Sequence, residues 1–377
     1  MAQYSCYFAD AFGTRLADAS NFLALEYSRV VNAVSTAKLT LPGNFPTQYI
    51  INPDGRLEIW RKLDSGREYL DTGTIWLIKK VTQKIESSGL QTIVIEADTP
   101  LCVLREPGRF VSYYAGTSQA VYAAAPADNQ IKQVARDNIG SSASGTSLVT
   151  SRNLSAYISI DPNLSLGASV AKSFAFRDCL KIMQEFANAS TTAGTYIAFD
   201  IVADTPTTLI FRTFAQQRGV DHRFPGGINP VLISPELGNL GEVTFSQDYR
   251  DEMTYVMSGG KGENTERLLA FAEDTTRQGL SPFGLREYFK DATQYNDTTG
   301  LAAEAQATLR SGRAKTIFQG RLIDMPDSRY GVDWGWGDYV TAQAFGQLID
   351  CRIDAVSVSV KPGASYERID AWLRGNQ

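Results

Sequence analysis

The chain contains a single histidine, His222, within the polar segment Gly219–Arg223. Zinc sites that need two or three histidines are therefore excluded. A Ser-His-Asp triad would have to use this residue, yet neither a G-x-S-x-G elbow nor a Cys-His signature accompanies it. We interpret His222 as a surface residue beside a domain boundary, and we predict no catalytic residue.

Two groups of neighbouring carboxylates could supply the acid and base of a glycosidase. The first is Asp248 with Asp251 and Glu252, and the second is Asp324 with Asp327. Nothing in the sequence places either group in a cleft, and acidic residues are common near turns. We interpret both groups as solvated surface, with a cell-wall-degrading lysin as the alternative from the enzyme class.

The glycine-rich segment Ser258–Glu263 superficially resembles a phosphate cradle. A P-loop needs G-x-x-x-x-G-K-[ST] between a strand and a helix, and here Lys261 is followed by Gly262. We therefore interpret the segment as a loop after a strand.

The segment Tyr330–Tyr339 holds Trp334, Trp336 and three glycines. In a carbohydrate- or receptor-binding module, these tryptophans would stack on sugar rings. We favour a structural interpretation, in which the glycines form a turn that leads into a strand and the aromatic side chains close a barrel end or pack at a subunit contact.

The four cysteines lie far apart and form no C-x-x-C pair: Cys6, Cys102, Cys179 and Cys351. Apolar neighbours, as in Leu101–Val103, favour small buried residues over disulfides or a zinc site. We predict no bound metal and no cofactor.

The charge and hydropathy patterns exclude two further classes. The net charge is −5 and no dense basic run occurs, which argues against a protein that grips nucleic acid. Residues 1–20 do not have the pattern of a secretory signal, and no window approaches the roughly 20 apolar residues of a membrane-spanning helix. We expect the protein to fold in a cytoplasm.

The elements that must position these residues begin with strands. Residues 1–105 show period-two alternation and turn signals such as Asn52–Gly55 and Ser87–Gly89, which predict a small barrel or sandwich. The predicted strands are Ala37–Leu41, Arg56–Trp60, Thr74–Val81 and Leu90–Glu96.

Residues 106–230 change character and predict an inserted α+β domain. Pro126 begins a helix with Ile131, Val134, Ala135 and Ile139 on one face, and Gly140 ends it. We predict a loop at 140–152, a second helix at 173–188 and a hairpin formed by 196–201 and 209–214. The apolar stripe of the second helix is Phe176, Cys179, Leu180, Met183, Phe186 and Ala187.

The Gly- and Pro-rich segment Phe224–Pro230 predicts a boundary, after which residues 231–377 form a second β domain. Its predicted strands are 241–247, 253–258, 315–323, 339–344 and 351–360. A helical excursion near 299–312 carries Leu301, Ala302, Ala305 and Leu309 on one face and ends at Gly312.

The order of these segments resembles the tail-hub (baseplate hub) proteins of long-tailed bacteriophages, siphophage relatives of the contractile-tail hub family. The resemblance is carried by Arg56–Trp60 followed by Asp71–Ile78, by Thr99–Glu106, and by Ser281–Glu287, the 301–309 helix and Tyr330–Val340. Unlike the larger contractile-tail hubs, this sequence shows no long C-terminal extension.

This resemblance implies a β-rich α+β chain with two tube-type β-barrel domains and an inserted small α+β domain. It implies a homotrimer at the virion's tail tip, joining the sixfold tail tube to threefold tip structures. The implied partners are a distal tail ring protein, the tape measure protein and tip or receptor-binding proteins, with DNA only passing through the channel.

Overall fold

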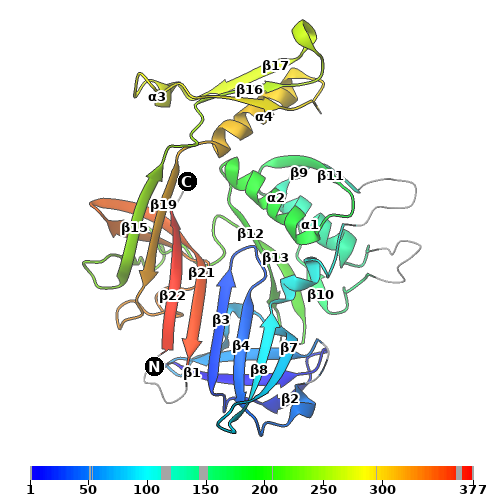
Figure 1. The fold of residues 1–377 in the computed structure, drawn as a ribbon, viewed down its shortest axis with the longest axis vertical. Helices are drawn as coiled ribbons and strands as arrows, with labels where there is room; N and C mark the ends of the chain where they lie inside the picture. The colour runs from blue at the N-terminus through cyan, green and yellow to red at the C-terminus, as the bar shows by residue number, and fades with distance from the viewer. Residues whose placement is uncertain are drawn as a thin grey trace.

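The computed structural model describes residues 2–50, 52, 54–111, 120–143, 152–205, 207–293, 295–361 and 367–375. Within them the chain is β-rich, with four α-helices and mainly antiparallel sheets (Figure 1). The β-rich α+β class predicted from the sequence is confirmed. None of the described helices is long and apolar enough to cross a membrane.

The largest sheet has 14 strands and draws on both ends of the chain. Its path runs β15-β19-β22-β21-β3-β4-β8-β7-β5-β1-β2, with β14, β20 and β6 attached at its sides. Its N-terminal strands are β1 (Gln3–Ala9), β2 (Arg15–Asp18), β3 (Ala24–Val30), β4 (Thr36–Pro42), β5 (Arg56–Lys62), β6 (Glu68–Leu70), β7 (Trp76–Ile85) and β8 (Gln91–Asp98). Its C-terminal strands are β14 (Leu232–Ile233), β15 (Leu240–Asp248), β19 (Lys315–Leu322), β20 (Tyr339–Ala344), β21 (Gln347–Val360) and β22 (Glu367–Gly375).

Alternating burial explains how these strands pack. Leu25 of β3 and Leu39 of β4 are fully buried, whereas the adjacent residues Glu26 and Lys38 are exposed. The inward side chains of both terminal regions form one hydrophobic core, in which residues such as Trp76 from β7 join residues such as Val358 from β21. The described strands follow an open path, so the predicted pair of closed barrels is not confirmed.

The inserted part packs α1 (Ala127–Asn138) and α2 (Cys179–Thr192) against two small sheets. As predicted, Pro126 stands at the N-terminal end of α1, and Ile131, Val134 and Ala135 are buried. The strands are β9 (Ala120–Pro126), β10 (Ile158–Ile160), β11 (Ser169–Phe174), β12 (Ile197–Ala203) and β13 (Leu209–Ala215). The predicted β12–β13 hairpin is confirmed; most of the predicted 140–152 loop, residues 144–151, lies outside the described residues.

The predicted start of the second helix is wrong. Residues up to Phe174 form β11 and pair with β9, so the helix begins only at Cys179. Asp178 caps it by accepting a hydrogen bond from the Lys181 backbone N–H at 2.9 Å. Phe176, placed on the buried stripe by its spacing, has a φ of 50° and is 51% exposed.

A third unit extends from the ends of β15 and β19. It comprises β16 (Tyr255–Gly259), β17 (Leu269–Glu273), α3 (Thr275–Gln278), β18 (Glu287–Asp291) and α4 (Thr298–Ser311). The α4 helix buries Leu301, Ala305 and Leu309 as predicted, but Ala302 is exposed. Short 3₁₀ turns complete the described elements at Thr47–Tyr49, Asp71–Gly73, Pro100–Leu104 and Asn264–Glu266.

Candidate assembly interface

His222 is buried, with 8% of its surface exposed, so its interpretation as a surface residue is wrong. Its backbone N–H donates to the Tyr339 carbonyl at 2.7 Å, because residues 219–224 run along the start of β20. The ring Nδ1 contacts the backbone carbonyls of Ile228 and Asn229, and Nε2 lies 3.6 Å from Asp338 Oδ2. These contacts hold the loop at residues 222–229 against the start of β20.

Asp338 is itself held as a structural group. Its carboxylate accepts the backbone N–H of Val220 at 2.7 Å and that of Gly335 at 2.5 Å. Burial raises the pKa of Asp338, and these hydrogen bonds and His222 oppose the rise. The carboxylate therefore joins two turns of the backbone to the histidine ring.

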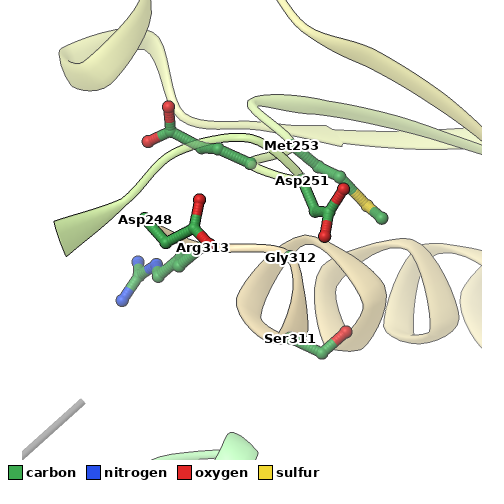
Figure 2. A pocket seen from close by; sticks show the side chains of 7 residues that line it. Asp248, Asp251, Met253, Ser311, Gly312 and Arg313 are labelled. Carbon is green, nitrogen blue, oxygen red and sulfur yellow. The ribbon is translucent and has the colours of Figure 1, made fainter. Parts of the chain in front are cut away.

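The acidic group of Asp248, Asp251 and Glu252 does line a small pocket, contrary to its interpretation as plain surface (Figure 2). The pocket measures about 120 Å³ and is completed by Met253 and residues 311–313 at the end of α4. This volume is below the roughly 300–1,000 Å³ of typical ligand pockets.

Arginines hold two of the three carboxylates around this pocket. Glu252 accepts two hydrogen bonds from Arg277, both at 2.8 Å, and lies 3.1 Å from Arg286. Asp248 pairs with Arg250 at 2.5 Å. Both carboxylates are therefore engaged by guanidinium groups of this chain rather than presented to a substrate. The geometry gives the glycosidase interpretation no support.

The two carboxylates of the second acidic group, Asp324 and Asp327, have different surroundings. Asp324 accepts the backbone N–H of Tyr330 at 2.7 Å and so shapes the turn before the aromatic segment. Asp327 lines a separate pocket of about 480 Å³, together with residues such as Leu237 and Val332.

The tryptophans of the 330–339 segment are buried rather than displayed. Trp334 is 1% exposed and Trp336 is 6% exposed. Two guanidinium groups lie close to the Trp336 ring centroid, that of Arg29 at 4.2 Å and that of Arg218 at 3.8 Å. The buried indoles and the glycine-containing turn before β20 agree with the structural interpretation rather than with tryptophans displayed to a sugar. Packing of these side chains at a barrel end or a subunit contact stays a prediction.

The Ser258–Glu263 segment is the connection of a hairpin. After β16 ends at Gly259, the Gly260 N–H donates to the Leu268 carbonyl at 2.8 Å and the chain returns antiparallel as β17. A phosphate cradle would lead into a helix instead.

All four cysteines are buried free thiols, as predicted. Burial raises the pKa of Cys102 to about 11 and those of Cys179 and Cys351 to about 12. The described residues contain no cluster of three or more His, Cys, Asp or Glu suited to a metal ion.

Two buried arginines, which the sequence did not single out, join distant parts of the chain. Arg29 of β3 donates to Asp200 of β12 at 2.5 Å, and Arg218 donates to the same carboxylate at 3.0 Å. Arg61 of β5 pairs with Glu367 of β22 at 2.5 Å and donates to the Tyr330 carbonyl at 2.7 Å. The first contact holds the inserted part to the large sheet, and the second holds the N-terminal strands to the C-terminal ones.

Eight consecutive strands of the large sheet form a wall to which each terminal region contributes four. They are β15, β19, β22 and β21 from the C-terminal region and β3, β4, β8 and β7 from the N-terminal region, shown side by side in Figure 1. Every neighbouring pair is antiparallel, and the two regions meet where β21 pairs with β3 from Ala355↔Val30 to Val360↔Leu25.

Both ends of this eight-strand wall have unpaired strand edges within the described part of the chain. At one end, β15 pairs only with β19. At the other, β5 reaches β7 only at Trp76 and Leu77, so the outer edge from Lys80 to Ile85 has no strand beside it. Such edges readily pair with another chain.

The solvent face of the wall carries a row of alternating charges on its N-terminal half, and Val30 and Trp372 are exposed apolar side chains on the same face. A row crosses four strands through the registered pairs Glu26↔Lys38, Lys38↔Glu96 and Glu96↔Lys80. All four side chains are exposed, and Lys80 lies 3.1 Å from Glu96. Opposite charges on facing strands stabilise the sheet and leave this row close to neutral.

Comparison with known proteins agrees with this architecture. The family described as Siphovirus ReqiPepy6 Gp37-like protein matches residues 116–370, well over half of the chain. No curated protein sequence matches it.

Three solved structures share the fold over almost their whole length. Prophage tail protein gp18 from Listeria monocytogenes has a TM-score of 0.55 at 12% identity, over 99% of this chain and 94% of that one. The tail protein from Neisseria meningitidis has a TM-score of 0.54 at 9% identity, over 98% and 96%. The 43 kDa tail protein of prophage MuSo2 from Shewanella oneidensis has a TM-score of 0.54 at 10% identity, over 98% and 97%.

The resemblance to phage tail proteins that the sequence indicated is thus confirmed. The chain belongs to the family of Siphovirus ReqiPepy6 Gp37-like proteins and has the fold of phage tail proteins.

Proposed function

We propose that this tail protein is a trimeric hub at the tail tip, a non-enzymatic adaptor between the sixfold tail tube and threefold tip structures. Its channel would pass the tape measure protein and later the DNA. One observation carries the proposal: the wall of eight antiparallel strands, four from each terminal region, whose two outer edges, apart from Trp76 and Leu77, have no strand beside them among the described residues.

The strand directions permit identical copies to extend this wall. Because eight strands alternate in direction, β15 and β7 run oppositely, so β7 of one copy can pair antiparallel with β15 of the next. The edges are also complementary in charge. The β7 edge carries Lys80 and Lys84, whereas β15 carries Glu242 and Asp248. Three copies would present six four-stranded units to a sixfold tube.

In this proposal the solvent face of the wall lines the channel. The alternating row from Glu26 to Lys80 holds equal numbers of acidic and basic groups, so passing DNA meets little net attraction. The core side of the wall packs on the shared hydrophobic cluster and cannot serve this purpose without exposing it.

The proposed roles of the three domains follow the predicted domain boundaries. Residues 1–105 and 231–377 contribute the two tube-type β domains, and residues 106–230 form a lateral domain. The partners would be a distal tail ring protein, the tape measure protein and tip or receptor-binding proteins. The protein would assemble in the host cytoplasm and reside at the tip of the virion.

The mass of the purified full-length chain tests the trimer. Native mass spectrometry should find a species of three times the 41.3 kDa chain mass. The double variant Lys80→Glu/Lys84→Glu should remain folded and lose this species. A wild-type chain that stays monomeric over the micromolar range, and forms no ring in assembled tails, would refute the hub.

A further inference from the structure

The three-stranded sheet of the third unit has one open face. In its order β17-β16-β18, Met257 of the central strand registers with Phe271 on one side and Phe289 on the other. Because side chains alternate between the faces of a strand, these three share one face with Tyr255 and Leu269. We call this surface the aromatic face.

The aromatic face is apolar and accessible in the single chain. Phe271 is 59% exposed, Leu269 50% and Phe289 48%. The rings of Tyr255 and Phe271 stack with their centroids 5.7 Å apart. Apolar side chains gathered to this extent on one exposed sheet face are typical of an interaction site.

The other face of this sheet already has a partner. Val256 and Ala272 on that side pack with Ala305 and Leu309 of α4. Figure 1 shows α4 between the sheet and α2 of the inserted part, so the aromatic face points away from the rest of the chain. The described residues of this chain therefore leave it uncovered.

Arg267 lies 5.1 Å from the Phe289 ring on this face, but the charges that lack an ion-pair partner among the described residues are acidic. Glu273 and Glu287 both register with Tyr255, one on each side, and both are exposed. Neither forms an ion pair within the described residues, whereas Asp291 on the same face pairs with Arg267 at 2.5 Å. A protein that covers this face would gain by bringing a cation to the two glutamates.

We propose that the aromatic face binds another protein of the tail, through an apolar surface that carries arginine or lysine opposite Glu273 and Glu287. Arginine suits the position because a guanidinium can pair with a carboxylate while stacking on Tyr255 or Phe271. A second copy is the poorer occupant, since the one cation placed on this face, Arg267, already pairs with Asp291 and so leaves none for the two glutamates. The proposal rests on the chain being a tail protein and does not depend on the number of copies in the hub.

Photocrosslinking in assembled tails tests this proposal. The variants Phe271→p-benzoylphenylalanine and Phe289→p-benzoylphenylalanine are supplied in place of the wild-type chain during phage growth, and tails are purified and irradiated. Both positions should crosslink to the same second tail protein, at a segment that contains arginine or lysine. The matched control is Phe345, which is 67% exposed in the turn between β20 and β21 and should not crosslink to that segment.

Charge reversal separates recognition from folding. Glu273→Lys/Glu287→Lys should reduce the crosslink at position 271 at least tenfold and leave the melting temperature and the native mass of the isolated chain unchanged. Crosslinks to a second copy of this chain, no crosslink from either position in complete tails, or a crosslink that survives the charge reversal would each overturn the proposal. A monomeric native mass would refute the trimeric hub and would leave the crosslinking result at positions 271 and 289 unaffected.

Discussion

Replacing Asp200 with alanine removes the carboxylate that neutralises Arg29 at the contact between the inserted part and the large sheet. Both side chains are buried, at 1% and 2% exposure, and Arg29 Nη2 lies 2.5 Å from Asp200 Oδ2. The Nε and Nη1 atoms of Arg29 have no hydrogen-bond acceptor, so Asp200 is the sole acceptor for Arg29 among the described residues. Burial lowers the pKa of Arg29 to about 10, and Asp200 opposes that effect.

The expected cost follows from leaving a buried charge uncompensated. Removing one partner of a buried ion pair costs about 3–5 kcal/mol. Arg218, 3.0 Å from the same carboxylate, loses its partner too, which places Asp200→Ala towards the upper end. With a urea dependence of about 3 kcal/mol per M, the unfolding midpoint should fall by roughly 1–1.7 M.

Urea unfolding, followed by tryptophan fluorescence, measures this difference against a matched control. Asp161→Ala breaks a comparable pair with Arg212 at 2.6 Å, but those side chains are 29% and 42% exposed, so the loss should stay below about 1 kcal/mol. The apolar double variant Arg29→Met/Asp200→Leu should fold and recover part of the stability, because it removes the buried Arg29 charge while Arg218 still lacks its carboxylate. Equal losses for Asp200→Ala and Asp161→Ala, or a double variant less stable than Asp200→Ala, would refute the reasoning.

The remaining predictions concern the edges, the core and the titrating groups. Lys80→Glu/Lys84→Glu should keep the wild-type circular dichroism spectrum while losing the trimer in native mass spectra; a persisting trimer would exclude these edges as the contact. Trp334→Ala should cost about 3–5 kcal/mol in urea unfolding, because a buried indole leaves a cavity; a loss below about 1 kcal/mol would contradict its place in the core. Burial raises the pKa of Asp71 above its ordinary 3.8, so its contribution to stability is full below that pH and is lost as the pH rises. Asp71→Asn should therefore flatten the fall in melting temperature from about pH 4 upward, and a steeper fall would contradict this assignment. Cys102, whose pKa burial raises to about 11, should react with a thiol reagent at pH 8 at least tenfold more slowly in the folded chain than in urea, and equal rates would contradict its burial.

Local patterns were sufficient to predict the strands whose burial alternates regularly. The predicted Ala37–Leu41 and Arg56–Trp60 lie within β4 and β5, and Pro126 marks the beginning of α1. The missed strand β22 and the misplaced start of α2 have a different cause. β22 is defined by pairing with β21, and β11 replaces the predicted first turn of α2 by pairing with β9, some 45 residues earlier in the chain.

The contacts that join the separate parts of the chain depend even more on residues far apart in the sequence. Arg29 and Asp200 are 171 residues apart in the sequence, and nothing in either neighbourhood indicates the pair. His222 is buried because residues 219–224 run beside β20, more than a hundred residues later, and residues 227–231 fold back over them. The union of the two β regions into one wall rests on the β3–β21 pairing, which no periodicity predicts.

An electron cryo-microscopy reconstruction of the purified tail tip, without imposed symmetry, tests the hub most directly. It should contain three copies of this chain around the channel, with β7 of each copy antiparallel to β15 of the next and Glu26, Lys38 and Glu96 facing the bore. Any other number of copies in the ring, or a ring in which the β7 and β15 edges stay apart, would contradict the account.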